Sequence, residues 1–296
     1  MSETVGILGL GIMGSAIAPN LMKAGFGVVG YDPLAERRSA LETAGGRAVG
    51  SPRAVAEAAP AVVSLLPSAT ALEEAALGAD GLAAAGREGL ILIECSTLPV
   101  AAKQAVRQRL TESGVAMLDC PLSGTGAQAA KKDLVAFASG EEEHFETCRA
   151  ALQGFCKSAL YLGPFGNGST MKFVANLLVS IHNVAAAEAL TLGMKAGLDP
   201  QLIYEAVIGG AGSSRMFEVR GPLMVAEAYD EATMKNEVWM KDIAIITEFA
   251  RALGAPTPLF AASAELYSAT MAQGRGKEDT AAVCAVMEEM ARVKRA

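Results

Sequence analysis

The residues best suited to chemistry lie in one stretch just past the middle of the chain, residues 166–176, which read GNGSTMKFVAN. Two glycines precede an apolar helical pattern, so Lys172 and Asn176, four residues apart, are expected on one face of a helix. A lysine can transfer a proton and an amide can orient a substrate, a pairing suited to acid–base catalysis. The alternative is a solvated lysine near a helix N-terminus. The apolar helix and the motifs earlier in the chain favour catalysis.

A glycine-rich turn near the N-terminus has the spacing of a dinucleotide-binding loop. An apolar run at residues 5–8 is followed at once by a G-x-G-x-x-G sequence and then by a helical pattern. The first glycine allows the tight turn, the second lets the backbone approach a pyrophosphate, and the third lets the helix lie close to the strand. The helix N-terminus offers N–H groups to the phosphates. The expected cofactor loop is Gly9, Leu10, Gly11, Ile12, Met13 and Gly14.

Asp32 bears on the choice between NAD and NADP because it ends the next β-rich run, residues 27–31. A carboxylate at this position can accept hydrogen bonds from the adenosine ribose and repels a 2′-phosphate. The sequence therefore favours NAD. Arg37 and Arg38 follow and could receive a phosphate, which keeps NADP possible, although we interpret them as the exposed start of the next helix.

Strand-like and helix-like runs alternate up to about residue 163, and almost everything after that is helical. Alternation of this kind indicates a parallel sheet covered by helices. We therefore predict an α/β fold: a Rossmann-type dinucleotide-binding domain at residues 1–163, followed by an all-helical domain at residues 164–296 that a long helix joins to it. The last two strands of the first domain are expected at residues 134–138 and 158–161.

Three loops of the first domain are expected to face cofactor and substrate, because ligands of open α/β sheets bind beyond the carboxyl ends of the strands. These loops contain Leu66-Pro67, Ser96-Thr97 and residues 123–126. Backbone amides and hydroxyl groups there can hold a carboxylate without a metal ion.

The composition of the 296 residues narrows the class of protein: 51% are hydrophobic and 19% are charged. A net charge of −7 disfavours nucleic acid or an anionic membrane as the main partner. The five cysteines have no C-x-x-C spacing and the N-terminus has no basic leader, so we expect reduced thiols, a cytoplasmic location and no metal. The apolar helix near residues 173–195 is interrupted by polar residues, which favours a buried helix over a membrane span.

Three features of the second half have open interpretations. His182 lies in the apolar helix and is expected to be a satisfied core histidine. The glycine-rich segment 209–214 is either a loop that closes over a substrate or a plain turn between helices. Lys241-Asp242 is either an exposed couple or a pair that faces the cofactor.

Together these motifs resemble the β-hydroxyacid dehydrogenase family, which includes 3-hydroxyisobutyrate dehydrogenase and tartronate semialdehyde reductase. The resemblance covers nearly the whole chain, with the nucleotide loop, the DCPLSG segment at 119–124, the stretch 166–176 and the Lys241-Asp242 pair in the family's order. It implies hydride transfer between a nicotinamide cofactor and a small β-hydroxy acid or its semialdehyde or keto form. The implied roles are general acid/base for Lys172, substrate orientation for Asn176, carboxylate binding for Ser123, Gly124 and Thr125, and cofactor lining for Leu66, Pro67, Thr97 and Lys241.

Three positions depart from the family pattern: Thr125 and Lys132 stand where glycines are usual, and Ala175 stands where Asn or His is frequent. All three lie near the parts that recognise the substrate, so they are expected to affect which substrate is bound and to leave hydride transfer intact. The alternatives are an imine reductase-like enzyme, which typically lacks the catalytic lysine, and a non-catalytic NAD(P)-binding protein of the same fold. The apolar surface of the long helix predicts a homodimer or homotetramer through the helical domain.

Overall fold

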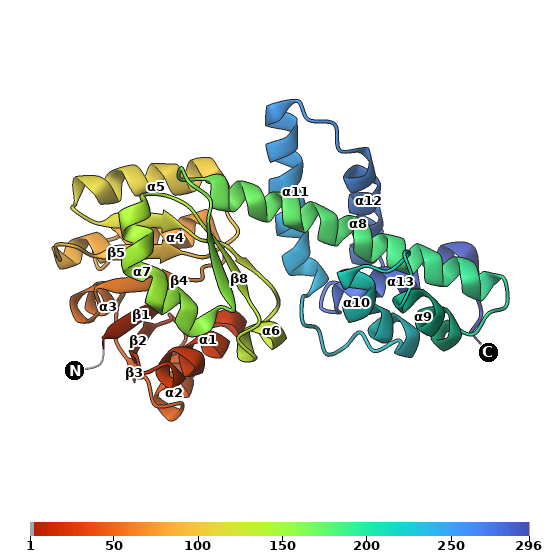
Figure 1. The fold of residues 1–296 in the computed structure, drawn as a ribbon, viewed down its shortest axis with the longest axis horizontal. Helices are drawn as coiled ribbons and strands as arrows, with labels where there is room; N and C mark the ends of the chain where they lie inside the picture. The colour runs from red at the N-terminus through yellow and green to blue at the C-terminus, as the bar shows by residue number, and fades with distance from the viewer. Residues whose placement is uncertain (1–2, 296) are drawn as a thin grey trace. The chain divides into compact units, whose positions relative to one another are not determined.

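The structure, a computed structural model, describes residues 3–295. It divides into two compact units, Met1–Lys172 and Phe173–Ala296, which we call unit 1 and unit 2. Unit 1 combines a parallel sheet with helices and unit 2 is helical, so the predicted fold class is confirmed (Figure 1). The division falls inside helix α8, Asn167–Lys195, whereas the sequence placed the boundary at residue 163.

The main sheet of unit 1 has six parallel strands in the order β3-β2-β1-β4-β5-β6. Ile7 in β1 pairs with Gly30 on one side and with Val63 on the other, so the strand order reverses at β1. In open α/β sheets this reversal leaves a crevice at the carboxyl ends of the strands. The strands are β1 Thr4–Leu8, β2 Gly27–Tyr31, β3 Arg47–Ala48, β4 Ala61–Ser64, β5 Ile91–Glu94 and β6 Ala116–Asp119.

Helices cover both faces of this sheet and create two apolar clusters. In β5, Ile91 and Ile93 belong to one cluster, and Leu92 between them belongs to the other. This alternation follows from the two-residue period of a strand, and burial on both faces explains the continuous apolar runs in the sequence. The helices are α1 Ile12–Lys23, α2 Ala35–Thr43, α3 Pro52–Ala58, α4 Ala69–Leu77, the 3-10 helix η1 Leu82–Ala85, α5 Val100–Glu112, α6 Gly126–Ala130 and α7 Glu142–Phe155.

A second, three-stranded sheet follows, with β7 Leu122–Ser123, β8 Val135–Ala138 and β9 Ser158–Tyr161. Strand β7 is antiparallel to β8, and β8 is parallel to β9. The last two strands lie where the sequence predicts them. A bridge between Asp119 and Ser139 links the two sheets, because each residue's N–H donates to the other's carbonyl.

Unit 2 is built along the greater part of α8, with the remaining helices packed on it and on one another. Ser180 and Asn183 of α8 are buried and bond to Ser263 and Tyr267 of α12. By length and composition alone α8 could span a membrane, but buried core helices pass the same test. The other elements are α9 Pro200–Ile208, α10 Arg215–Ala226, α11 Asn236–Leu253, α12 Pro258–Ala272, the 3-10 helix η2 Thr280–Ala282 and α13 Val283–Ala291.

Candidate active site

The glycine-rich loop forms a cradle that suits a dinucleotide. Gly9 adopts φ +88°, and a Cβ there would collide with the carbonyl oxygen of Leu65. A Cβ at Gly14 would collide with the carbonyl oxygen of Gly9, so α1 and β1 lie as close as backbones allow. Gly11 is the N-cap of α1 and provides no side-chain cap. The helix start can therefore offer its N–H groups to an anion. The side chain of Ile12, the next residue, is 65% exposed and provides an apolar surface beside the cradle.

Asp32 fastens this loop to the end of β2. Its carboxylate is 2% exposed and accepts hydrogen bonds from the backbone N–H of Leu10 at 2.9 Å and of Leu34 at 3.0 Å. Arg37 lies 3.2 Å from the same carboxylate, and Arg38 donates to the carbonyl oxygen of Asp32 at 2.7 Å. The two arginines belong to the first turns of α2, as expected, but they also surround Asp32.

The loops after β4 and β5 are tied together at the carboxyl edge of the sheet. The N–H of Leu66 donates to the hydroxyl of Ser96 at 2.8 Å, and the N–H of Ser96 donates to the carboxylate of Glu94. Leu66 and Thr97 are half-buried, and Pro67 is exposed. The structure thus brings Leu66 and Thr97 to the edge that also carries the glycine-rich loop, since β1 and β4 are neighbours.

The end of β7 and the turn that follows it contain the three residues expected to hold a carboxylate. Gly124 has φ +135°, and a Cβ there would lie 2.5 Å from Leu134 Cδ2, so the position requires glycine. Thr125 is the N-cap of α6 and forms a capping box with Gln128, whose side chain accepts from the Thr125 N–H at 3.0 Å. Thr125 thus has a local structural role. Lys132, the other departure, adopts the left-handed φ of +58° just after α6, where glycine is favoured.

Lys172 is 9% exposed, which argues against a solvated lysine at a helix end. It lies in the second turn of α8. Three residues earlier, the N–H and the hydroxyl of Ser169 each donate to Asp119 at 2.7 Å. The start of α8 is therefore fastened to β6, which explains why unit 1 extends as far as Lys172.

Asn176 lies one turn further along α8 and belongs to unit 2. It is 4% exposed, and its Nδ2 donates to Asp242 Oδ2 at 2.9 Å. Asp242 is itself buried, and Lys241 Nζ lies 3.4 Å from its other oxygen. The pair on α11 is therefore no simple exposed couple: Asp242 holds the amide of Asn176. The sequence left open whether this pair faces the cofactor, and it did not indicate Asn176 as the partner of Asp242.

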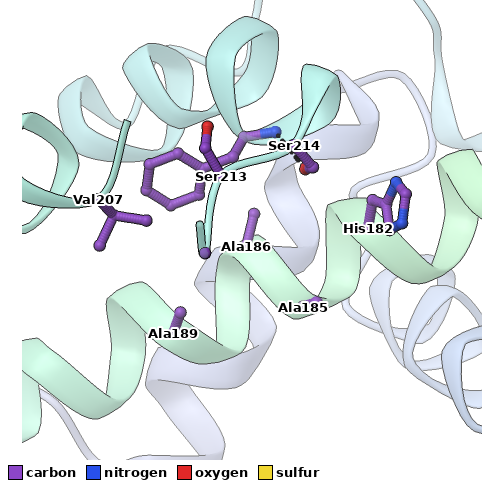
Figure 2. A pocket seen from close by; sticks show the side chains of 9 residues that line it. His182, Ala185, Ala186, Ala189, Val207, Ser213 and Ser214 are labelled. Atoms are coloured by element: carbon purple, nitrogen blue, oxygen red, sulfur yellow. Dashed lines mark hydrogen bonds between the residues drawn. The ribbon is translucent and has the colours of Figure 1, made fainter. Parts of the chain in front are cut away.

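A cavity of about 240 Å³ lies within unit 2. Figure 2 shows His182 and three alanines along α8, across from Val207, Ser213 and Ser214. His182 is half-buried and lines this cavity, so the expectation of a core histidine is wrong. The segment 209–214 joins α9 to α10, and its last residue caps α10 through a hydrogen bond to Phe217 N. Its serines, Ser213 and Ser214, line the cavity.

Among residues 3–295, no group of three or more His, Cys, Asp or Glu residues is arranged to hold a metal ion. The five cysteines are free and buried. Burial raises the pKa of Cys148, Cys156 and Cys284 to about 12, so these thiols remain protonated near neutral pH. Catalysis by a thiolate of these three residues is therefore disfavoured.

Comparison with known proteins matches both halves of the chain. Residues 4–163 match the family described as the NAD binding domain of 6-phosphogluconate dehydrogenase. Residues 166–287 match the family described as NAD-binding of NADP-dependent 3-hydroxyisobutyrate dehydrogenase. The two matches cover the glycine-rich loop, the Ser123 loop and the stretch that contains Lys172.

Individual relatives agree with these families along nearly their full length. L-threonate dehydrogenase of Cupriavidus necator is 34% identical, with 96% of this chain and 95% of the relative covered. NAD-dependent L-serine dehydrogenase of Pseudomonas aeruginosa is 30% identical, with coverages of 95% and 96%. The crystal structure of 3-hydroxyisobutyrate dehydrogenase from Salmonella typhimurium superposes with a TM-score of 0.87 at 31% identity and covers 96% of this chain and 100% of that one.

A likeness to imine reductases is weaker. The enzyme from Streptomyces aurantiacus is 19% identical, with a TM-score of 0.63 over 96% of this chain and 99% of that one. At this identity the likeness concerns the fold alone.

Proposed function

This chain belongs to the β-hydroxyacid dehydrogenase family, and from that premise we propose which of its residues carry out the reaction. The chain is an NAD(P)-dependent dehydrogenase that acts on hydroxyacids. The proposal rests on Lys172 and Asn176, two buried residues on one face of α8. The amide of Asn176 donates a hydrogen bond to Asp242 and is held in place by it.

The cradle of Gly9, Gly11 and Gly14 fits a dinucleotide, because side chains there would fill the space or collide with backbone. Bound NAD(P) supplies the site for hydride transfer to or from the substrate carbon. NAD is favoured by the buried carboxylate of Asp32, and Arg37 beside it keeps NADP within reach. In the proposal Leu10, Ile12 and Met13 complete the loop, and Leu66, Pro67, Thr97 and Lys241 line the cofactor.

Lys172 is the proposed general acid and base. In the oxidative direction its amine takes the proton of the substrate hydroxyl, and in the reductive direction its ammonium donates a proton to the carbonyl oxygen. Asn176 orients the substrate. Asp242 accepts from its Nδ2, which fixes the amide in one orientation and leaves the carbonyl oxygen of Asn176 available to accept from a hydroxyl.

The proposed substrate is a small 3-hydroxy acid. Ser123 and Gly124 are the proposed carboxylate ligands, and Thr125 contributes by shaping the loop, since its N–H and hydroxyl are bonded to Gln128. The relatives named for L-threonate support a substrate with further hydroxyl groups, such as threonate or glycerate, as the leading class.

We also propose that the enzyme is a cytoplasmic homodimer or homotetramer assembled through its helical unit. The support is the exposure of large apolar side chains on α8: Val174 is 51%, Leu178 is 46% and Leu192 is 73% exposed. Apolar surface of this kind is typical of subunit interfaces. The acidic net charge of −7 supports neither nucleic acid nor an anionic membrane as a partner.

The two alternative functions are disfavoured by the same residues. An imine reductase-like enzyme would not need the pairing of Lys172 with Asn176. A protein that only binds NAD(P) would not need a buried lysine and a buried amide that a carboxylate holds in place.

The test is the absorbance of NADH or NADPH formed from a panel of 3-hydroxyisobutyrate, glycerate, threonate, 3-hydroxypropionate and serine. We expect turnover of at least one acid, with NAD giving the higher kcat/KM. Turnover with NADP alone would overturn the preference assigned to Asp32. Absence of turnover with both cofactors, together with reduction of cyclic imines, would overturn the proposed function in favour of the imine reductase alternative.

A further inference from the structure

A buried lysine that the proposed reaction does not use lies at the centre of unit 1. Lys103 of α5 is fully buried, and its Nζ lies 2.7 Å from Glu94 Oε2 and 2.8 Å from Asp119 Oδ1. Burial opposes the charge of Lys103, but the two carboxylates outweigh it and raise its pKa above the ordinary value. The cluster of Lys103, Glu94 and Asp119, here called the buried ion cluster, therefore holds a permanent cation between the ends of β5 and β6.

One arm of the cluster reaches the first turn of α8. Asp119 accepts from the N–H and the hydroxyl of Ser169, both at 2.7 Å, and from the hydroxyl of Ser139 at 3.2 Å. The hydroxyl of Ser139 in turn accepts from the N–H of Gly168 at 2.9 Å. The first N–H groups of a helix have no partner within the helix, and a carboxylate near them is stabilised by the helix dipole. Asp119 thus caps α8 from a strand 50 residues earlier in the chain.

The close packing at Gly168 shows how tightly this turn is placed. A Cβ at Gly168 would collide with the carbonyl oxygen of Phe137 and would lie 2.6 Å from that of Asp119. The helix backbone therefore lies directly against β6 and β8. Lys172 is three residues after Ser169, so its position follows any rotation or shift of this turn.

The other arm of the cluster reaches the loops that we assign to the cofactor. Both oxygens of Glu94 accept from the N–H of Ser96, at 3.0 and 3.1 Å, and the hydroxyl of Ser96 accepts from Leu66 N. Lys103 is thus connected through Asp119 to Ser169, in the turn of α8 that precedes Lys172, and through Glu94 and Ser96 to Leu66.

We propose that the buried ion cluster is a positioning device that fixes Lys172 through Asp119 and Ser169, and the cofactor loops through Glu94 and Ser96. This inference rests on the proposed role of Lys172 as the acid and base. Lys103, Glu94, Asp119 and Ser169 are positioning residues in this scheme, since they act through Lys172 and the loops.

The first test removes one hydroxyl from the arm to α8. In Ser169→Ala we expect kcat to fall about 10- to 100-fold, because a misplaced reactive group loses rate steeply, with KM for NAD within about twofold. Ser169→Thr keeps the hydroxyl and should restore most of kcat. Ser180→Ala is the matched control: Ser180 is also a buried serine of α8, bonded to Ser263 at 2.9 Å. We expect its kcat to stay within about twofold of wild type.

The second test separates the two arms. In Glu94→Gln the acceptor of Ser96 N is weakened, so KM for NAD should rise by about tenfold or more while Ser169 keeps its bonds to Asp119. Binding of NADH, followed by its fluorescence, should weaken in parallel. A rise in KM for NAD of similar size in Ser169→Ala would overturn the separation of the arms.

Hydrogen exchange of the free enzyme gives a readout that does not depend on turnover. The hydroxyl of Ser169 donates one of this residue's two bonds to Asp119, so its loss should loosen the first turn of α8. A peptide covering residues 165–173 should therefore exchange faster in Ser169→Ala than in wild type or Ser180→Ala. If Lys172→Ala is inactive while Ser169→Ala has normal kcat, the inference fails and the proposed function stands. If Lys172→Ala keeps normal kcat, the proposed role of Lys172 fails, and the inference fails with it.

Discussion

The two units each contain a buried ion pair, and the partners around the two cations differ. In unit 1, Lys103 has two carboxylate partners, Glu94 and Asp119. In unit 2, Arg220 of α10 pairs with Asp279 at 2.9 Å, and both are buried. Asp279 also accepts from Thr233 N at 2.8 Å and from Ala281 N at 3.0 Å. In unit 1 one lysine therefore neutralises two carboxylates, whereas in unit 2 one arginine neutralises a single carboxylate. Neutral donors bond to the carboxylates of both units.

The two units also differ in their buried polar atoms that lack a hydrogen-bond partner. Within residues 3–295, the buried side-chain atoms with no hydrogen-bond partner all belong to unit 2: Asn183 Oδ1, Thr191 Oγ1, Ser213 Oγ, Tyr229 OH, Asn236 Oδ1 and Trp239 Nε1. Unit 2 also carries most of the exposed large apolar side chains. Unit 1 thus pairs its buried polar side chains more completely, whereas unit 2 exposes more of its large apolar side chains.

The largest expected effect comes from removing the two buried cations in turn. Lys103→Met leaves two carboxylates beside each other and should destabilise unit 1 by about 3–5 kcal/mol. Arg220→Met leaves Asp279 with its neutral donors and should cost unit 2 only about 1–3 kcal/mol, without change in kcat. Urea denaturation measures both. Equal losses of unfolding free energy in the two variants would contradict the difference between the buried ion cluster and the Arg220–Asp279 pair.

The loss caused by Lys103→Met should not shrink as pH rises from 6 to 9. The folded-state pKa of Lys103 is raised, so its contribution to stability is fully present below the unfolded pKa of about 10.4 and is lost only as pH rises through the folded value. A loss that shrinks markedly across this range would mean that Lys103 is neutral in the folded protein.

The second prediction tests the surface of unit 2. Leu178→Glu places a charge on the exposed apolar face of α8 and should shift the enzyme toward the monomer, because burying an unpaired charge in an interface is costly. Leu160→Glu in β9 is the matched control, since Leu160 is 48% exposed but belongs to unit 1. Light scattering after gel filtration gives the mass. A monomeric wild type, or dissociation by Leu160→Glu alone, would contradict the proposed interface.

The smallest expected effect concerns Lys132, whose left-handed φ of +58° is strained for a residue with a side chain. Lys132→Gly should stabilise unit 1 by about 0.5–1 kcal/mol, because the relief of strain exceeds the entropy cost of glycine. Lys131→Gly is the control, since Lys131 has φ −93° and gains nothing from glycine. Thermal unfolding of both variants measures the difference. A loss of stability in Lys132→Gly would contradict the claim that the backbone of Lys132 is strained.

The sequence predicted much of the fold, because the signals were local. The glycine spacing from Gly9 to Gly14 specifies a strand, a turn and a helix, and Asp32 marks the end of the next strand. The sequence also predicted a helix that carries Lys172 and Asn176 together. These inferences rely on apolar residues that recur with a period of two residues in strands and 3.6 residues in helices. Such patterns can be read from residues close together in the chain.

Long-range partners could not be predicted in this way. Asp119 appeared in the sequence as part of the DCPLSG segment, and only the structure shows it capping α8 at Ser169. Asp242 appeared as a neighbour of Lys241, and its bond to Asn176 spans 66 residues. His182 was misjudged because the apolar helical pattern does not reveal which side of α8 borders a cavity. Such contacts depend on how the helices and strands pack. A single sequence does not give the distances between residues that are far apart in the chain.

The central claim, that Lys172 transfers the proton, is tested most directly by the kcat of Lys172→Ala on the best acid of the panel, with NADH binding measured by fluorescence. We predict that kcat falls about 10²- to 10⁴-fold, that NADH binds within about threefold of wild type, and that the pH dependence of the residual rate loses one ionisation. A Lys172→Ala enzyme with kcat within tenfold of wild type and an unchanged pH profile would contradict the claim.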